Sequence, residues 1–231
     1  MRRIVQIKII LVALSGLWFT THAMSQDLSG KERKAIATQA IKDLAGGTLI
    51  LRLKSKHNKI TKLEELLATP DIKASTRTKL SEDLESTIDE RNRFNRSLTY
   101  AFEEYYSFSN IYYIYDTASV SLINGQRSGI FLNEDLELDL TIEIPEGIFF
   151  VLKVGTTDSA STTGVEALVM MDRNLKDLAA PFPYYVRVNS IGRLFTRIFN
   201  HKKLVKKDSK KIVQKLESNL QRYNTEVRGE R

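Results

Sequence analysis

The chain has no cysteine, and it has only three histidines among 231 residues. Without thiols, a disulfide framework, a thiolate metal site and a cysteine nucleophile are all excluded. His22, His57 and His201 are far apart in the sequence, and the His-Glu-x-x-His motif of a zinc hydrolase is missing. The Gly-x-Ser-x-Gly motif of serine hydrolases is missing as well. These absences favour a binding protein over an enzyme.

Long hydrophobic runs are also scarce. The run at residues 9–19 has eleven residues without charge, whereas a bilayer span needs about 20 apolar residues. Three cations precede this run: Arg2, Arg3 and Lys8. This order is typical of a secretory signal peptide, which we place at residues 1–25, with cleavage after Ala23 or Ser25 and with a retained membrane anchor as the alternative. We therefore expect an exported protein, periplasmic or extracellular, and not a lipoprotein, because no cysteine is available for a lipid.

Positive charge is concentrated near the carboxyl terminus of the sequence. Residues 201–231 carry ten Lys+Arg and four Asp+Glu, whereas residues 26–200 sum to −2. Apolar residues at helical spacing predict an amphipathic helix over about residues 201–225. Its lysines are Lys202, Lys203, Lys206, Lys207, Lys210, Lys211 and Lys215. They are either the solvated side of a helix packed on a sheet or a contact surface for an anionic membrane. Nucleic-acid binding is disfavoured, because no aromatic residues are interleaved with these lysines.

Helical periodicity recurs in three further segments. Ser29 and Glu32 form a capping-box pattern before a helix that stops at two glycines. A polar turn over residues 54–59, which includes His57, precedes a second helical stripe. Residues 71–106 predict one long helix, or two helices joined near residues 91–93, since this segment has no internal proline. Its expected start is Thr69-Pro70-Asp71.

Strand-forming runs separate these helices. The glycine- and serine-rich stretch at residues 155–164 lies between two of them and predicts a hairpin, and therefore antiparallel pairing. Strict alternation at residues 136–144 predicts a segment with one buried and one solvated face. The other runs are residues 48–53, 110–115, 148–154, 165–171 and 184–188, the last at a sheet edge because prolines adjoin it.

These elements predict an α/β fold, with α+β as the alternative. We expect a single domain over residues 26–231, with a mixed sheet of four to five strands. The long helix over residues 71–106 and the C-terminal helix are expected to pack over this sheet. The pattern leaves the strand order and the oligomeric state open.

Three aspartates are candidate ligands for a divalent metal ion. Asp116 and Asp172 each follow a predicted strand directly, and Asp158 lies shortly after a third. Ligands bind at the carboxyl ends of strands in open α/β sheets, and carboxylate oxygens bind divalent cations. The same aspartates also fit helix caps or turns, and a hairpin would send the strand that ends at Asp172 to the opposite edge. A metal-dependent hydrolase is therefore an alternative rather than the main interpretation.

The remaining candidates point to binding without cofactors. Arg127 is a candidate for contact with a carboxylate or phosphate, and Tyr184 and Tyr185 are a candidate aromatic platform. Eight aromatic residues within residues 100–115 favour a packed core over a sugar-binding surface. The sequence predicts an exported, non-catalytic binding or assembly protein of the cell envelope. Its expected partner is another envelope protein, or an anionic membrane surface bound through the C-terminal helix.

Overall fold

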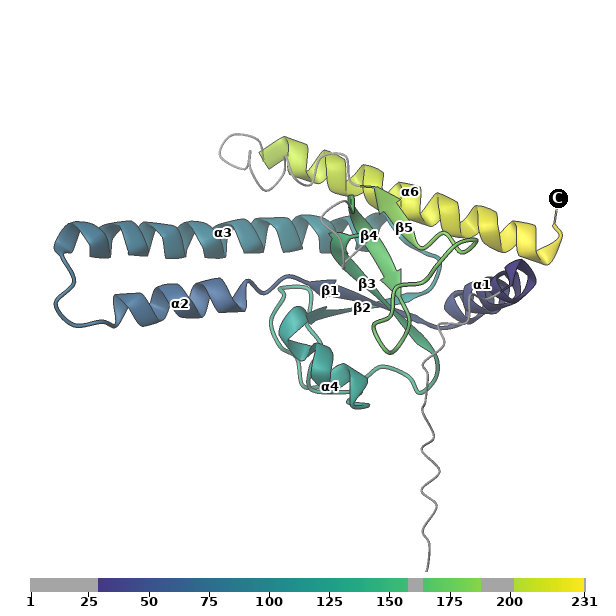
Figure 1. Ribbon diagram of the computed structural model, residues 1–231, viewed down its shortest axis with the longest axis horizontal. Coiled ribbons are helices and arrows are strands. Elements are labelled where there is room, and N and C mark those ends of the chain that lie inside the picture. The colour runs from purple at the N-terminus through teal and green to yellow at the C-terminus, as the bar shows by residue number, and fades with distance from the viewer. Residues whose placement is uncertain (1–28, 158–163, 188–201, 231) are drawn as a thin grey trace, which may run out of the picture.

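A computed structural model describes residues 29–157, 164–187 and 202–230 of the chain (Figure 1). Within these ranges, five strands form one mixed sheet in the order β2-β1-β3-β4-β5. β1 is parallel to both β2 and β3, whereas β4 is antiparallel to β3 and β5 is antiparallel to β4. The strands are β1 (Thr48–Leu53), β2 (Asn110–Tyr115), β3 (Phe149–Thr156), β4 (Glu166–Met171) and β5 (Tyr185–Arg187). This arrangement confirms the α/β fold with a mixed sheet.

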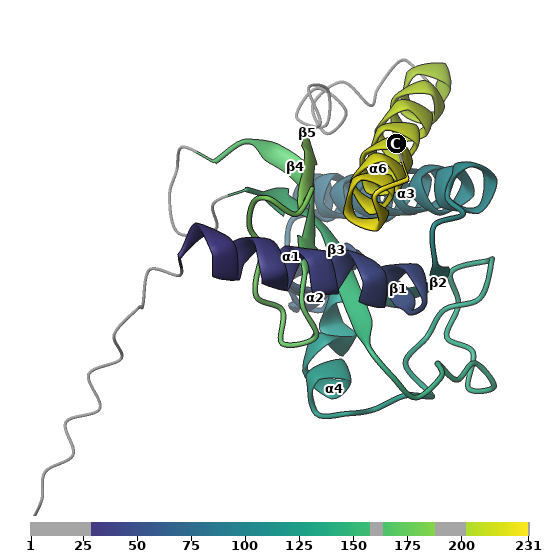
Figure 2. The same cartoon turned by 90° about the vertical axis from the view of Figure 1, so that its right-hand side faces the viewer.

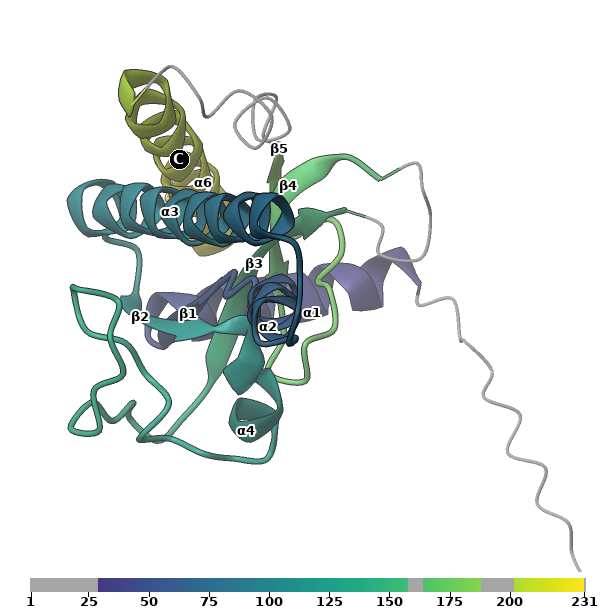
Figure 3. The same cartoon turned by 90° about the vertical axis from the view of Figure 1, so that its left-hand side faces the viewer.

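Helices cover both faces of the sheet. Figure 2 and Figure 3 show α3 and α6 together on one side of the sheet, with α4 on the other side. α3 and α6 run in the same direction, and a hydrogen bond between the hydroxyls of Ser97 and Ser209 (3.1 Å) joins them inside the core. The helices are α1 (Gly30–Ala45), α2 (His57–Leu67), α3 (Ala74–Tyr105), α4 (Ser119–Ile123) and α6 (Lys202–Arg228), together with the 3-10 turn η1 (Asp116–Ala118). The predicted packing of the long helix and the C-terminal helix over the sheet is confirmed.

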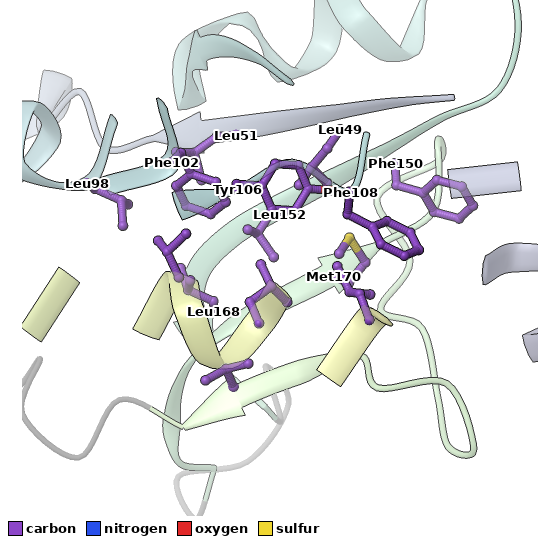
Figure 4. Close-up of a cluster of buried hydrophobic side chains, with 14 of the residues drawn as sticks. Leu49, Leu51, Leu98, Phe102, Tyr106, Phe108, Phe150, Leu152, Leu168 and Met170 are labelled. Carbon is purple, nitrogen blue, oxygen red and sulfur yellow. The ribbon is translucent and has the colours of Figure 1, made fainter. Parts of the chain in front are cut away.

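The alternation of side chains along β1 divides the core into two clusters. Leu49 and Leu51 point to the face covered by α1, α3 and α6, where Phe102 is also buried (Figure 4). Ile50 points to the other face and packs with Leu122 of α4. Successive residues of a strand face opposite sides of the sheet. The largely apolar β1 is therefore buried on both faces.

α2 and the first half of α3 form a helical hairpin that extends beyond the sheet (Figure 1). α3 has 32 residues, but the first of its side chains to be buried is Thr87. On α2, Ile60 and Leu63 are buried. At the base of the hairpin, the Lys56 ammonium, just before α2, pairs with the Glu90 carboxylate of α3 (2.8 Å).

Several helix and strand boundaries predicted from the local sequence are correct. Ser29 Oγ accepts a hydrogen bond from the Glu32 amide, and Glu32 Oε2 accepts one from the Ser29 amide, so the capping box is confirmed. The runs at residues 48–53 and 110–115 are β1 and β2 to the residue, and the long helix is unbroken. β3 and β4 pair antiparallel, as the hairpin prediction required.

Two predictions of local structure were wrong. α3 begins at Ala74 rather than at Thr69-Pro70-Asp71, because Asp71 has a φ of 59° and so turns the chain between α2 and α3. The alternating residues 136–144 form no strand. Leu136, with a φ of 64°, interrupts the extended backbone, and Leu138 and Leu140 are 59% and 72% exposed.

Candidate functional site

A pocket of about 640 Å³ lies where β1 and β2 end. Parallel strands end at the same edge of a sheet, so the loops after β1 and β2 meet there. Open α/β sheets bind ligands outside the carboxyl ends of their strands. We call this the strand-edge pocket. Its lining residues are Lys54, Ser55, Lys56, His57, Asn58, Lys59, Asp116 and Thr117.

The loop after β1 is held in place by hydrogen bonds. Asp116 Oδ1 accepts a hydrogen bond from the Ser55 amide (3.0 Å) and so connects the ends of β1 and β2. The Asn95 side-chain amide, which is fully buried, donates to the Lys54 carbonyl (3.0 Å). Lys56 has a φ of 53°, which turns the chain sharply into α2. Sheet pairing therefore sets the position of the first turn of α2 in the pocket.

The first turn of α2 is electropositive. The partial positive charge of a helix N-terminus favours anions and acidic side chains, but this turn has no acidic residue, and the side chain of its N-cap residue, Lys56, caps none of its amides. Its exposed residues are His57, Asn58 and Lys59. The pocket thus combines a helix N-terminus with basic side chains, and Asp116 is the acidic residue among those that line it.

The Lys54 side chain is half-buried in the lining of this pocket. Desolvation lowers the pKa of Lys54, and the positive charges of Lys56 and Arg52 act in the same direction. The carboxylates of Glu166 and Asp116 oppose the shift by stabilising the ammonium. Partial burial of the Lys54 ammonium costs free energy, and the nearby carboxylates of Glu166 and Asp116 offset part of this cost.

The structure does not bring Asp116 and Asp172 together. Asp116 follows the carboxyl end of β2, whereas β4 runs the other way and Met171 pairs with Val151 near the start of β3. Asp172 instead forms a turn, since its carboxylate accepts hydrogen bonds from the amides of Asn174 (2.8 Å) and Lys176 (2.9 Å). Asp158 lies outside the residues that the structure describes. Within the described ranges, no group of three His, Asp or Glu residues is arranged to hold a metal ion.

The other predicted ligand-binding residues lie away from the strand-edge pocket. The Arg127 guanidinium stacks on the Phe149 ring, 4.5 Å from its centroid, on the face of the sheet that α4 covers. Tyr184 and Tyr185 have ring centroids 4.8 Å apart, and Tyr185 lies on β5, which β3 and β4 separate from β1. These three residues do not form one site with Asp116.

The C-terminal helix packs its apolar side into the core. Ile212, Val213, Leu216 and Leu220 are buried, whereas the lysines of α6 whose side chains the structure describes are exposed. These lysines are Lys207, Lys210, Lys211 and Lys215; the side chains of Lys202, Lys203 and Lys206 lie outside the described part. Lys210 Nζ lies 4.6 Å from the centroid of the Tyr105 ring. Attachment to an anionic surface through this helix stays a prediction.

Sequence reasoning missed most of the strand-edge pocket. It placed His57 in a solvated turn, whereas His57 is the first residue of α2. Lys54 and Lys59 were part of the same turn and were not considered as ligand-binding residues. The signal in the sequence was the density of lysines between a strand and the next helix, which belongs to no recognised motif.

The fold and the strand-edge pocket define an α/β protein with an electropositive pocket at the ends of parallel strands. Comparison with protein-family models, curated proteins and solved structures gave no match. Among the helices in the described part of the chain, none has the length and apolar character needed to cross a bilayer.

Proposed function

We propose that this protein is an exported, non-catalytic binding protein of the cell envelope that holds a small anionic ligand in the strand-edge pocket. The ligand class is a phosphate or carboxylate compound. The observation that carries the proposal is the first turn of α2, which places His57 and Lys59 at a helix N-terminus without any acidic residue. Ser55 Oγ already accepts from the His57 amide, so an anion bound there would accept hydrogen bonds from the next backbone amides of the turn and neutralise the basic side chains.

The contacts of the pocket residues support binding rather than catalysis. Nδ1 of His57 lies 3.5 Å from Oγ1 of Thr61 on the same helix, and Oγ of Ser55 accepts a hydrogen bond from the His57 amide. A serine nucleophile needs a histidine base within hydrogen-bonding reach of its hydroxyl. The structure gives no such contact between the His57 ring and Ser55 among the described residues.

Replacing Lys59 with glutamine is expected to weaken the binding of inorganic phosphate about fivefold, as the loss of one partly solvated charge contact predicts. The measurement is isothermal titration calorimetry at low salt, with pyrophosphate and citrate as further probes. Lys62→Gln is the matched control, because Lys62 lies on the same helix, is exposed and pairs with Glu65 outside the pocket.

A second variant changes the charge in the opposite direction. Asp116→Asn keeps an oxygen that accepts the Ser55 hydrogen bond but removes a negative charge, so phosphate should bind more tightly. Increasing the salt concentration should weaken binding to the unmodified protein. If Lys59→Gln and Lys62→Gln bind phosphate equally well, or if Asp116→Asn weakens binding, the anion site is disproved.

The export part of the proposal is supported by the pattern in residues 1–25. Intact-mass spectrometry of the protein recovered from its native cells should show a chain that begins after Ala23 or Ser25. A chain that retains Met1 would contradict export by a cleaved signal peptide, and it would leave the phosphate titration unaffected.

A further inference from the structure

The strand-edge pocket contains a carboxylate that a simple anionic ligand does not explain. Asp116 lines the pocket together with Lys54, Lys56 and Lys59. An ionised carboxylate accepts hydrogen bonds but donates none, and it repels a bound phosphate. A ligand that offers only negative charge would therefore bind less tightly because Asp116 is present. The position of Asp116 favours a ligand that also carries a hydrogen-bond donor.

The Asp116 carboxylate is fixed next to the first turn of α2. Its Oδ1 accepts a hydrogen bond from the Ser55 amide (3.0 Å), and Ser55 Oγ accepts one from the His57 amide (3.1 Å). Two hydrogen bonds through one residue thus connect the carboxylate to the helix N-terminus. The Ser119 hydroxyl also donates to the Asp116 carbonyl (2.7 Å). A carboxylate that is held in this way loses little conformational entropy when a ligand binds.

One oxygen of this carboxylate is left for a ligand. The hydrogen bond from Ser55 occupies Oδ1, whereas Oδ2 forms no hydrogen bond to a described residue. In the described ranges, the ion pairs do not include Asp116. Asp116 is half-buried, and its Oδ2 is not enclosed by protein atoms. Oδ2 can therefore accept a hydrogen bond from a molecule in the pocket.

A hydroxyl is a better donor to Asp116 than an ammonium group. Asp116 already stabilises the positive charge of Lys54, and the charge of Lys56 lies close enough to destabilise it. An ammonium group on the ligand would add another cation to this basic lining, which costs free energy. A hydroxyl brings no charge, and its hydrogen bond to a carboxylate is stronger than one to a neutral acceptor.

The pocket is also larger than an inorganic anion needs. Its volume of about 640 Å³ lies within the range of about 300–1,000 Å³ that is typical of small-molecule sites. In dinucleotide-binding folds, a phosphate lies at a helix N-terminus and a carboxylate further along the chain binds a sugar hydroxyl. Their glycine-rich loop is missing here, since Lys54, Ser55 and Lys56 connect β1 to α2. A sugar monophosphate therefore fits this pocket better than a dinucleotide.

We propose that the strand-edge pocket binds a phosphorylated sugar or polyol, with its phosphate at the first turn of α2 and a hydroxyl group donating to Asp116 Oδ2. This inference rests on the proposed function, because it requires the anion site. It adds the second half of the ligand and gives Asp116 a role in selecting it. Asp116 lowers the affinity for phosphate alone and raises the affinity for a phosphate that is attached to a hydroxylated carbon chain.

The test is calorimetric titration of the full chain at low salt with ribose 5-phosphate, inorganic phosphate and phosphoethanolamine, which carries an ammonium group instead of hydroxyls. Ribose 5-phosphate should bind at least tenfold more tightly than either, as about one charge-assisted hydrogen bond predicts. Asp116→Asn keeps an oxygen for the Ser55 amide. It should tighten phosphate binding and weaken ribose 5-phosphate binding about fivefold. These opposite signs separate the role of the carboxylate from a loss of folding, which would weaken both ligands.

The matched control is Asp83→Asn, which changes an exposed aspartate of α3 outside the pocket and should leave both affinities unchanged. The inference is overturned, with the anion site intact, if ribose 5-phosphate binds no more tightly than phosphate. It is also overturned if phosphoethanolamine binds more tightly than ribose 5-phosphate. The anion site itself fails separately, and the inference with it, if Lys59→Gln leaves the binding of both ligands unchanged.

A further titration identifies the source of the sugar or polyol phosphate. Glycerophosphoglycerol is a phosphodiester with free hydroxyls, like the headgroup of a lipid or the repeat of a phosphate polymer. Tighter binding of this diester than of ribose 5-phosphate would support the proposal with a lipid or polymer as the source. Tighter binding of ribose 5-phosphate would support it with a free sugar phosphate as the source.

Discussion

Replacing Phe102 with alanine is expected to lower the free energy of unfolding by about 3–5 kcal/mol. Phe102 is fully buried between α3 and the sheet, and its ring centroid lies 5.5 Å from that of Tyr106 (Figure 4). Truncation removes buried apolar surface and leaves a cavity that the surrounding strands cannot fill. Since domains are stable by only about 5–15 kcal/mol, this is a large share of the total. Urea denaturation followed by circular dichroism measures the change.

The control for this substitution is Glu104→Ala, which changes an exposed residue of the same helix. Both substitutions introduce alanine into the helix and so have similar effects on helix propensity. The Glu104 variant should stay within about 0.5 kcal/mol of the unmodified protein. If Phe102→Ala has an equally small effect, α3 does not pack on the sheet as described.

Replacing Gly47 with alanine is expected to destabilise the fold by about 1–3 kcal/mol through overpacking. Gly47 lies between α1 and β1, where a Cβ atom would be 2.5 Å from the Asp43 carbonyl oxygen and 2.7 Å from that of Ile148. Both atoms belong to the backbone, so relief requires a shift of α1 or of the chain that enters β3. Thermal denaturation and urea denaturation would each report this loss.

The adjacent glycine gives a matched control. A Cβ atom at Gly46 would have the Lys42 carbonyl oxygen as its nearest neighbour, at 4.0 Å, and the φ of Gly46 is −101°. Gly46→Ala should therefore be neutral, or stabilising by up to about 1 kcal/mol, because it restricts the unfolded chain. Equal effects of the two substitutions would contradict the close approach of α1 and β3 at Gly47.

The elements that could be predicted were those specified by neighbouring residues. β1 is an apolar run after two glycines, and α3 is a long periodic stripe without proline, so their ranges followed closely from the sequence. Residues 136–144 had an equally clear alternation, but Leu136 adopts a left-handed backbone conformation and the loop exposes Leu138 and Leu140. Alternation reports which side chains are apolar, and it does not report whether a partner strand is present to pair with them.

The candidate site was less predictable, because its residues meet only after the strands pair. Asp116 was identified as a residue at a strand end, but its actual partner is the amide of Ser55, 61 positions earlier in the chain. The parallel pairing of β1 with β2 brings these two residues together, and no local pattern encodes that pairing. The same pairing brings Lys54 and the first turn of α2 to the pocket. Asp172 was excluded from the site by the antiparallel direction of β4, which the glycine-rich connection did predict.

The uninterrupted course of α3 has a mechanical consequence. Its 32 residues span about 48 Å at the usual helical rise, and the end that holds Phe102 is clamped by tight packing, while the other end stands clear with α2. A displacement of a few ångströms at residues 67–74 would therefore reach the core as a small rotation of α3, because a helix without an internal proline has no built-in kink to absorb it.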